Sequence, residues 1–375
     1  MTSLLSSPEA PVPAPIPVPA PVPVLDLDAY RSWVEADIGR FLDAKARGVG
    51  IERLPAPAVE SLRTFFRAGG KRLRPLLCAC GWLAARGGRE TAGLIRVGAA
   101  LEMFHAFALI HDDVMDRSDL RRGRPTVHRL LAADFARSHP TGDSSRLGES
   151  AAILVGDLSL AWSDELIHSA GLEPAVFARV LGLIDRMRSE LMFGQYLDLV
   201  TDARSGGGCA QPLTVIRYKT AKYTVERPLQ IGAVLAGAGE DVLADLSAIA
   251  LPLGEAFQLR DDLLGTFGDP GVTGKSRLDD LRAGKHTVLI ALALGVADRD
   301  QTAVLHGVLG NEAISEADAD RARHVLDATG ATARVERMIA DRYRRTLAAL
   351  DRAALPADAN EALRSLAHDA VWRRV

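Results

Sequence analysis

Three aspartates stand at the end of an apolar segment in the stretch LIHDDVMDRSDLRRGRPTVH, residues 109–128. They are Asp112, Asp113 and Asp116, and the apolar run 107–110 precedes them. Residues four apart share one face of a helix, so Asp112 and Asp116 are expected to point the same way. Like charges repel there unless a cation bridges them, and Mg²⁺ prefers carboxylate and phosphate oxygens. A solvated acidic helix end is the simpler alternative, but the apolar run favours a metal site.

A second acidic pair emerges from another apolar segment, EAFQLRDDLLGTFGDPGVTGK, residues 255–275. Asp261 and Asp262 follow Gln258 by three and four residues, a spacing that predicts one shared helical face. Two carboxylate sets that face each other could hold several Mg²⁺ ions around a diphosphate group. The two segments together therefore predict a diphosphate site between two helices.

Basic side chains occur near both acidic segments and could neutralise a diphosphate. A glycine pair precedes Lys71, Arg72 and Arg74 in GGKRLRP, residues 69–75. Arginine offers forked hydrogen bonds to phosphate, and lysine offers a point charge. The other basic candidates follow the first acidic segment or lie in and beside the glycine-rich loop after the second: Arg121, Arg122, Lys275 and Lys285. Each cluster alone could be a solvated turn, whereas together with the carboxylates they predict a Mg²⁺-bridged diphosphate site.

The elements that must position these residues are helices. Between residues 26 and 375, Ala, Leu and Arg are abundant, aromatic residues make up only 5% of the chain, and apolar residues recur at helical spacing. We predict an all-α fold, a single large helical bundle. Residues 1–25 form a separate Pro-rich leader, because proline falls at every second position from Pro11 to Pro23. We expect this leader to be extended and disordered, with a docking segment as the alternative.

Bulk properties exclude several other classes of protein. The formal net charge of −3 gives no global basic field for nucleic acid. The sequence contains no run of 18 consecutive apolar residues, so it predicts no membrane-spanning helix. The three cysteines, Cys78, Cys80 and Cys209, suggest neither a disulfide framework nor a zinc site. We therefore predict a reduced, cytoplasmic protein that neither binds nucleic acid nor spans a membrane.

The motifs resemble those of the trans-isoprenyl diphosphate synthases, also called the polyprenyl synthetase family. The resemblance runs from roughly residue 65 to 287 and keeps the family's order: GGKRLRP, DDVMD, RRGRPTVH, Gly156-Asp157, GQYLDL, YKTAKYT and FQLRDD. It implies an all-α bundle of the isoprenoid synthase type around a deep central cavity, assembled as a homodimer. It also implies a transferase that condenses isopentenyl diphosphate with an allylic diphosphate.

The resemblance also implies a role for each site residue. Asp112 and Asp116 would hold Mg²⁺ at the allylic diphosphate, and Asp261, supported by Asp262, would hold a further ion; we expect three ions in all. The residues expected at the allylic diphosphate are Arg121, Lys219, Lys275 and Lys285. Those expected at isopentenyl diphosphate are Lys71, Arg74, His105 and Arg122. Those expected to face the developing allylic cation are Lys219, Thr220 and Gln258. Without the resemblance, His105 would be taken for an ordinary core histidine.

One departure from the family pattern concerns the second acidic motif. The usual form is DDxxD, but its last position here is Gly265. Asp269 follows Asp262 by seven residues, which on a continuous helix is nearly the same face, roughly 10 Å further along the axis. Asp269 could act through water or not at all, and a direct contact with the metal is not expected.

The residues just before the first acidic motif give a partial prediction of the chain length of the product. Phe107 and Ala108 lie five and four residues before Asp112. In the family, bulky residues at these places form the floor of the elongation cavity, and one aromatic followed by a small residue resembles the C20-forming members. We therefore predict geranylgeranyl diphosphate as the product. A C15 farnesyl synthase or a longer-chain synthase is the alternative, and Phe107 could instead be ordinary core packing.

Two different kinds of protein compete with the synthase. A class I terpene cyclase would share the helical fold and the first acidic motif, but would carry an Asn/Ser/Glu metal motif as the second and would have no use for GGKRLRP. A non-catalytic partner subunit would tend to lose the acidic motifs, whereas both remain here. The active synthase is therefore the favoured hypothesis.

Overall fold

The computed structural model describes residues 25–52, 55–88, 92–138, 141–201, 208–269 and 277–372, and helices dominate these ranges. The N-terminal half contains α1 (Leu27–Glu52), α2 (Ala56–Arg67), α3 (Leu73–Ala84), α4 (Ala92–Met115), α5 (Val127–Ser138), α6 (Ser144–His168) and α7 (Pro174–Val200). The C-terminal half contains α8 (Ala210–Val215), the π-helical segment η2 (Ile216–Glu226), α9 (Arg227–Leu235), α10 (Glu240–Phe267), α12 (Asp279–Arg282), α13 (Val288–Leu294), α14 (Arg299–Val308), α15 (Glu316–Ala328), α16 (Ala331–Arg352) and α17 (Ala357–Val371). The predicted all-α class is confirmed.

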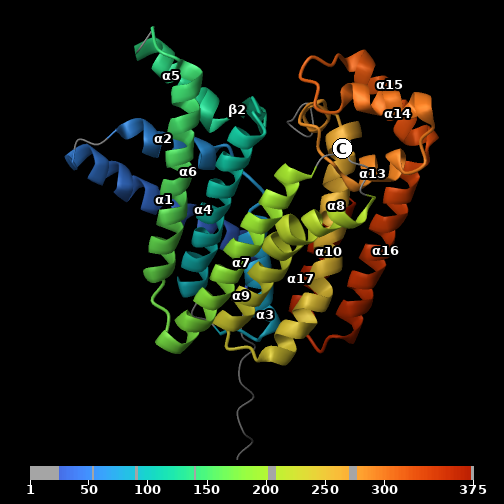
Figure 1. The fold of residues 1–375 in the computed structure, drawn as a ribbon. Coiled ribbons are helices and arrows are strands. Elements are labelled where there is room, and N and C mark those ends of the chain that lie inside the picture. The colour runs from blue at the N-terminus through green and yellow to red at the C-terminus, as the bar shows by residue number, and fades with distance from the viewer. Residues whose placement is uncertain are drawn as a thin grey trace, which may run out of the picture.

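The long helices lie side by side and form one bundle (Figure 1). Helix α4 packs against α6, α3 packs against α9, and α10 packs against both η2 and α16. Helix α3 is buried over nearly its whole length, as expected for an apolar helix at the centre of a bundle. The short helices α13, α14 and α15 lie at one end of the bundle, on the side opposite α5 (Figure 1).

Local sequence signals begin several of these helices. Asp143 accepts a hydrogen bond from the Arg146 backbone at the start of α6. Asp298 and Ser315 form capping boxes at the starts of α14 and α15, which satisfy backbone donors that have no partner within the helix. Gly330 separates α15 from α16 and has a left-handed backbone conformation, with φ of +72°. Glycine adopts this conformation at little cost because it has no Cβ. These local signals fix helix ends, while burial fixes how the helices pack.

The one strand pair in the described part of the chain is a two-residue hairpin, β1 (Leu120–Arg121) with β2 (Arg124–Pro125). Its turn residues Arg122 and Gly123 have φ values of +54° and +71°, as a tight two-residue hairpin turn requires. The sequence showed no strand pattern of useful length, and the hairpin was not predicted. The hairpin is so short that its two turn residues can specify it without a longer strand pattern.

Helices α4 and α10 are long and apolar enough to cross a membrane, by length and composition only. Within the bundle, 67% of the apolar window of α4 and 44% of that of α10 is buried in protein. Packing therefore accounts for the apolar character of α4 in particular. That the chain does not span a membrane stays a prediction.

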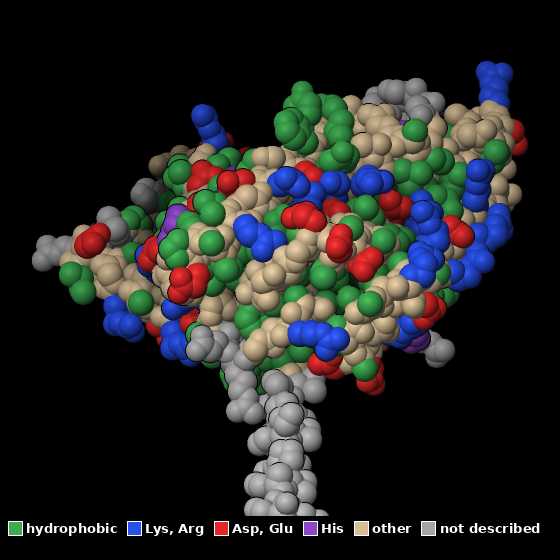
Figure 2. All heavy atoms as spheres, turned by 90° about the horizontal axis from the view of Figure 1, so that it is seen from below, with side chains coloured by type: hydrophobic (Ala, Val, Ile, Leu, Met, Phe, Trp, Pro, Cys, Tyr) green, Lys and Arg blue, Asp and Glu red, His purple; other side chains and the backbone are tan. Residues whose placement is uncertain are grey.

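Charged side chains of both signs are distributed over the face of the molecule that Figure 2 shows. Lys and Arg side chains alternate there with Asp and Glu over most of the area, although basic side chains gather toward one edge (Figure 2). That the chain binds no nucleic acid stays a prediction. The predicted Pro-rich leader lies outside the described residues except for Leu25.

Candidate active site

A cavity of about 1270 Å³ collects almost every residue singled out from the sequence. Its lining includes Lys71, Arg74, His105, Phe107, Ala108, Asp112, Arg121, Arg122, Lys219, Thr220, Gln258, Asp261, Asp262 and Lys285. Asp116 is not part of the lining, but it forms an ion pair with Lys285, in which Asp116 Oδ2 lies 2.8 Å from Lys285 Nζ. Lys275 lies outside the described residues. The structure thus joins two acidic segments that are far apart in the chain.

The three carboxylates at the C-terminal end of α4 have different partners. Asp113 is only 2% exposed and receives a forked hydrogen bond from Arg121, with N–O distances of 2.6 to 2.9 Å. Asp112 faces the cavity and lies 3.7 Å from the Arg121 guanidinium. The forked pair ties the β1–β2 hairpin to α4. Arg121 therefore has a structural partner as well as a position at the cavity.

Lys219 connects the first acidic helix with α7. Its Nζ donates to Asp112 Oδ1 at 3.1 Å and to Asp198 Oδ2 at 2.7 Å. Gln195, one turn earlier on α7, donates to the same Asp112 oxygen at 3.2 Å. Sequence reasoning placed Gln195 and Asp198 in the GQYLDL motif but assigned neither a role. The structure makes them partners of the lysine and the aspartate at the predicted allylic site.

Electrostatics at Asp112 favour the ionised carboxylate. Burial alone would raise the pKa of Asp112, but the charges of Lys219 and Lys285 outweigh it and hold that pKa well below its usual range. Lys285 is itself surrounded by carboxylates, which raise its pKa although burial acts to lower it. Both groups are therefore charged near neutral pH, as a site for a cation and an anionic substrate requires.

A hydrogen-bonded chain also connects η2 with α10 at the cavity. Thr220 Oγ1 donates to Gln258 Oε1 at 2.7 Å, and Gln258 Nε2 donates to Asp262 Oδ1 at 2.8 Å. Burial, reinforced by the charges of Asp280 and Asp261, raises the pKa of Asp262 to about 7. The chain fixes the amide of Gln258 and holds Asp262, which lines the cavity beside Asp261.

The segment η2 that carries Lys219 and Thr220 is π-helical, which the sequence did not indicate. Such wide turns are rare and frequently occur at functional sites. Two glycines let neighbouring helices approach it closely: a Cβ on Gly194 of α7 would lie 2.5 Å from Lys219 N, and one on Gly254 of α10 would lie 2.4 Å from Ala221 Cα. The functional side chains of η2 are therefore positioned by tight backbone packing on two sides.

A separate cationic group lies around the start of α3. Arg74 is 9% exposed, donates to Thr224 Oγ1 at 2.7 Å and lies over the Tyr223 ring at 4.3 Å. His105 Nδ1 is 3.0 Å from Tyr223 Oη. Burial first, and then the charge of Arg74, lowers the pKa of His105 well below its usual value. His105 is therefore a neutral imidazole at neutral pH, which can donate a hydrogen bond without adding charge.

The loop before α3 is bound to the hairpin through Arg122, which donates to the Gly69 carbonyl. This contact places Arg122 beside Lys71, an exposed residue at the cavity mouth. Arg72, the remaining cation of GGKRLRP, also lines the cavity, and it pairs with Glu35 at 3.0 Å and Glu102 at 3.3 Å. All three cations of the predicted basic cluster therefore reach the cavity together with Arg122, and Arg72 is in addition paired with two carboxylates.

The expectation for Asp269 rested on a helix that continues past Asp262, and this part was wrong. Helix α10 ends at Phe267, and Gly268 is extended with ψ of 156°. Asp269 is exposed and is not part of the cavity lining. It therefore does not stand above Asp262 on a common helical face.

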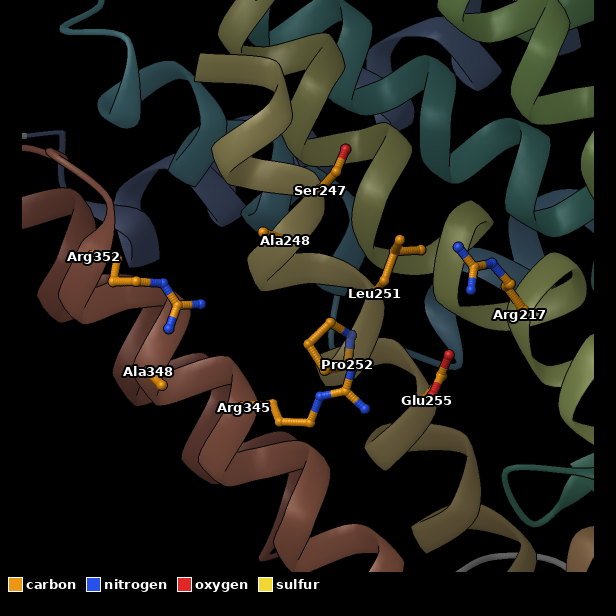
Figure 3. Close-up of a pocket in the computed structure, with 9 residues that line it drawn as sticks. All are labelled: Arg217, Ser247, Ala248, Leu251, Pro252, Glu255, Arg345, Ala348 and Arg352. Atoms are coloured by element: carbon orange, nitrogen blue, oxygen red, sulfur yellow. The ribbon is translucent and has the colours of Figure 1, made fainter. Parts of the chain in front are cut away.

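A second hollow of about 530 Å³ lies between α10, α16 and η2 (Figure 3). Its side chains include three arginines, Arg217, Arg345 and Arg352, and one carboxylate, Glu255. Glu255 already pairs with Arg342 at 2.8 Å. With no second carboxylate in its lining, this hollow lacks the paired acidic groups of the large cavity.

No group of three His, Cys, Asp or Glu side chains within the described ranges converges closely enough to enclose a metal ion by itself. Mg²⁺ does not need such a group, because it binds through one or two protein carboxylates and completes its shell with water and substrate phosphate oxygens. The available donors are all carboxylate oxygens, the ligand type that this hard cation prefers. The residues therefore fit Mg²⁺ that arrives together with a diphosphate.

The bundle and its carboxylate-lined cavity place the chain in the all-α isoprenoid synthase class. A family model described as polyprenyl synthetase matches residues 57–326. Geranylfarnesyl diphosphate synthase of Aeropyrum pernix is 36% identical over 271 residues, which cover 71% of this chain and 78% of that protein. Geranylgeranyl diphosphate synthase of Saccharolobus solfataricus is 34% identical over 263 residues, 70% of this chain and 74% of that protein.

The structural comparison agrees. A geranylgeranyl pyrophosphate synthase from Corynebacterium glutamicum, complexed with isoprenyl diphosphate and magnesium, matches with a TM-score of 0.89 and 38% identity over 93% of this chain and 100% of that one. The chain belongs to the polyprenyl synthetase family. It is a prenyl diphosphate synthase, a transferase that uses isoprenoid diphosphates.

Proposed function

We propose that this chain is a Mg²⁺-dependent synthase that condenses isopentenyl diphosphate with an allylic diphosphate and forms geranylgeranyl diphosphate. The observation that carries the proposal is one cavity that unites carboxylates from α4 and α10 with two separate cationic groups. Two diphosphates need two such groups, whereas a reaction on a single substrate needs one. The magnesium and isoprenyl diphosphate found with the Corynebacterium glutamicum enzyme support the same chemistry.

Asp112 and Asp116 on one side, and Asp261 and Asp262 on the other, would hold Mg²⁺, with three ions as our proposal. When bound, Mg²⁺ stabilises the negative charge that develops on the departing diphosphate. Asp116 and Asp112 now pair with Lys285 and Lys219, respectively, so the same lysines can turn toward the diphosphate when a cation takes up the carboxylates. Arg121 lies near enough to Asp112 to contribute in the same way.

The second cationic group is suited to isopentenyl diphosphate. Arg74 and Arg122 approach from the start of α3 and from the hairpin, with Lys71 at the mouth. The neutral His105 ring, held by Tyr223, can donate one hydrogen bond without further repulsion among the cations. These side chains would hold the diphosphate still while leaving the isopentenyl double bond free to point inward.

The reaction then needs three events in sequence. The allylic C–O bond ionises, the isopentenyl double bond attacks the resulting carbocation, and a proton leaves the new chain, with the departing diphosphate as the nearest base. Thr220 and Gln258 present oxygen atoms in a fixed arrangement that can stabilise the positive charge as it develops. Lys219, which contacts the carboxylate of the first motif, would follow the leaving diphosphate. Lys275 is proposed for the same diphosphate from sequence resemblance alone.

We further propose that Phe107 and Ala108 set the product at C20. Both residues line the cavity, and Phe107 packs against Phe104 and His111 with ring centroids 5.4 and 4.7 Å away. A large aromatic ring supported on two sides can limit how far a growing chain extends. The cytoplasmic location and the homodimer expected from the sequence are part of the same proposal.

The purified chain should release pyrophosphate only when isopentenyl diphosphate, an allylic diphosphate and Mg²⁺ are all present. A coupled assay for pyrophosphate would follow turnover, and a chelator should abolish it. Asp112→Asn should lower turnover about 10²- to 10³-fold, the scale of losing one charge-stabilising group. Asp241→Asn, an exposed position at the far end of α10, is the control with the same change of charge.

Three other outcomes would overturn the proposal in different ways. Release from the allylic substrate alone would indicate a terpene cyclase. No release under any condition, from a folded chain, would indicate a non-catalytic partner subunit. Full activity of Asp112→Asn at saturating Mg²⁺ would remove the metal assignment while leaving the reaction class intact.

A further inference from the structure

Gly265 occupies the position at which the second acidic motif departs from DDxxD. Its surroundings show what fills the space that an aspartate side chain would take there. It lies four residues after Asp261, on the same face of α10. A Cβ built on Gly265 would lie 2.1 Å from Asp280 Oδ2, well inside van der Waals contact. The carboxylate of Asp280 therefore fills the space into which a side chain at position 265 would project.

Asp280 reaches this place from a short helix that is held firmly. It belongs to α12, where the neighbouring Leu281 is buried and its carbonyl accepts from Gly310 N at 2.9 Å. Arg282 Nη2 donates to the Ile314 carbonyl at 3.2 Å. The Asp280 carbonyl itself accepts from Lys285 N at 3.1 Å. The backbone around Asp280 is thus fixed by contacts to the segments that follow it.

The charges around Asp280 belong to the proposed active site. Lys285 Nζ lies 3.6 Å from Asp280 Oδ1 and 2.8 Å from Asp116 Oδ2, so one ammonium group links it to the first acidic motif. Asp280 also lines the large cavity together with Asp261 and Asp262, and its charge contributes to the electrostatic environment of Asp262. Asp280 therefore adds a carboxylate from α12 to the two that α10 supplies at this wall of the cavity.

We propose that Asp280 supports the second Mg²⁺ site through the water molecules that complete the ion's shell, from the place that the last residue of DDxxD would take on α10. This inference rests on the proposed function, because it needs a cation at Asp261. A side chain at position 265 and the Asp280 carboxylate compete for one space, so the glycine and the aspartate act as a pair. Asp269, the alternative in the sequence, lies beyond the end of α10 and away from the cavity.

The direct test is a calorimetric titration of Mg²⁺ and inorganic pyrophosphate into the purified full chain. Asp280→Asn should weaken Mg²⁺-dependent binding about 10- to 100-fold, the usual effect of removing a supporting carboxylate from a metal site. Asp241→Asn should bind as the native chain does. Native-like binding by Asp280→Asn would overturn the proposal.

Moving the carboxylate between the two positions separates a metal role from a structural one. Gly265→Asp combined with Asp280→Ala should recover most of the affinity that Asp280→Ala alone loses. Gly265→Asp alone should lower the melting temperature, because two carboxylates then meet in one space. If the double variant keeps the native melting temperature but gains no affinity over Asp280→Ala, the two positions share one space and the metal role of Asp280 is wrong.

The same titration distinguishes this inference from the proposed function. A native chain that binds pyrophosphate without any dependence on Mg²⁺ would overturn the metal-dependent function as a whole. A native chain that requires Mg²⁺, with variants at positions 265 and 280 that behave like it, would overturn only the role of Asp280.

Discussion

Asp262 is the residue at which protons and Mg²⁺ should compete most strongly for the same carboxylate. Its folded-state pKa is raised from 3.8 to about 7, first by burial and then by neighbouring carboxylates. In the absence of metal, the folded chain therefore holds a proton between about pH 4 and 7 that the unfolded chain has lost. Folding binds the extra proton, so this contribution to stability is present at low pH and is lost as pH rises through 7.

We accordingly predict that the metal-free native chain loses thermal stability relative to Asp262→Asn as pH rises from 5 to about 8. Melting temperatures of both proteins in chelator, across that range, would check the difference. Mg²⁺ should stabilise the native chain more at pH 8 than at pH 6, because the ionised carboxylate is the ligand. Parallel pH profiles for the two proteins would show that Asp262 does not titrate in this window.

Phe107 and Ala108 offer a second prediction at the residue scale. Phe107→Ala should open the cavity floor and shift products beyond C20, and Ala108→Phe should shorten them. Phe177→Ala is a matched control, since this phenylalanine packs on His168 outside the cavity and loses the same volume. Chromatography of the dephosphorylated products would show the lengths. An unchanged distribution in both active variants would make Phe107 ordinary core packing.

At the scale of elements, the π-helical segment η2 depends on the helices beside it. Gly254→Ala would place a methyl group 2.4 Å from Ala221 Cα, so α10 and η2 must separate. We expect a loss of about 1–3 kcal/mol in stability, typical of overpacking, and a fall in turnover because Thr220 and Lys219 shift with η2. Denaturant unfolding together with steady-state assays would measure both effects.

Gly182→Ala on α7 is the matched control for this variant. Nothing lies within 4 Å of a Cβ at Gly182, so the change should stabilise the helix by about 0.5–1 kcal/mol and leave turnover unaltered. Equal stability changes for Gly254→Ala and Gly182→Ala would contradict the account of close packing.

The elements also show what the sequence could and could not predict. Helix ends bearing Asp112 and Asp261 were predictable, because apolar periodicity and local charge lie within a few residues. The π-helical geometry of η2 was not, since it arises from close packing by α7 and α10 rather than from local preference. The role of Asp280 was hidden as well. Its proximity to Gly265 depends on the path of the chain from α10 to α12.

At the scale of the whole molecule, large exposed apolar side chains are concentrated on two consecutive helices. On α6 and α7 they are Leu147, Ile153, Leu154, Met192, Phe193, Tyr196, Leu199 and Val200. Such concentrations favour association with another protein surface. The homodimer expected from the sequence would cover part of this apolar area.

We predict that the native chain is a homodimer and that Phe193→Asp, at a side chain that is 70% exposed, shifts it toward monomer. Sedimentation velocity at several concentrations would measure the assembly. Ile51→Asp is the control, because Ile51 is 83% exposed but lies on α1. A native monomer, or a Phe193→Asp variant that remains as dimeric as the native chain, would contradict this arrangement.

Whether the cavity elongates allylic diphosphates to C20 can be decided from the identity of the product. Purified chain would be incubated with labelled isopentenyl diphosphate, Mg²⁺ and, in separate reactions, dimethylallyl, geranyl or farnesyl diphosphate. We predict geranylgeranyl diphosphate as the main product from every starter that is accepted. A main product of C15, of C25 or longer, or a cyclised hydrocarbon that carries no diphosphate, would contradict the claim.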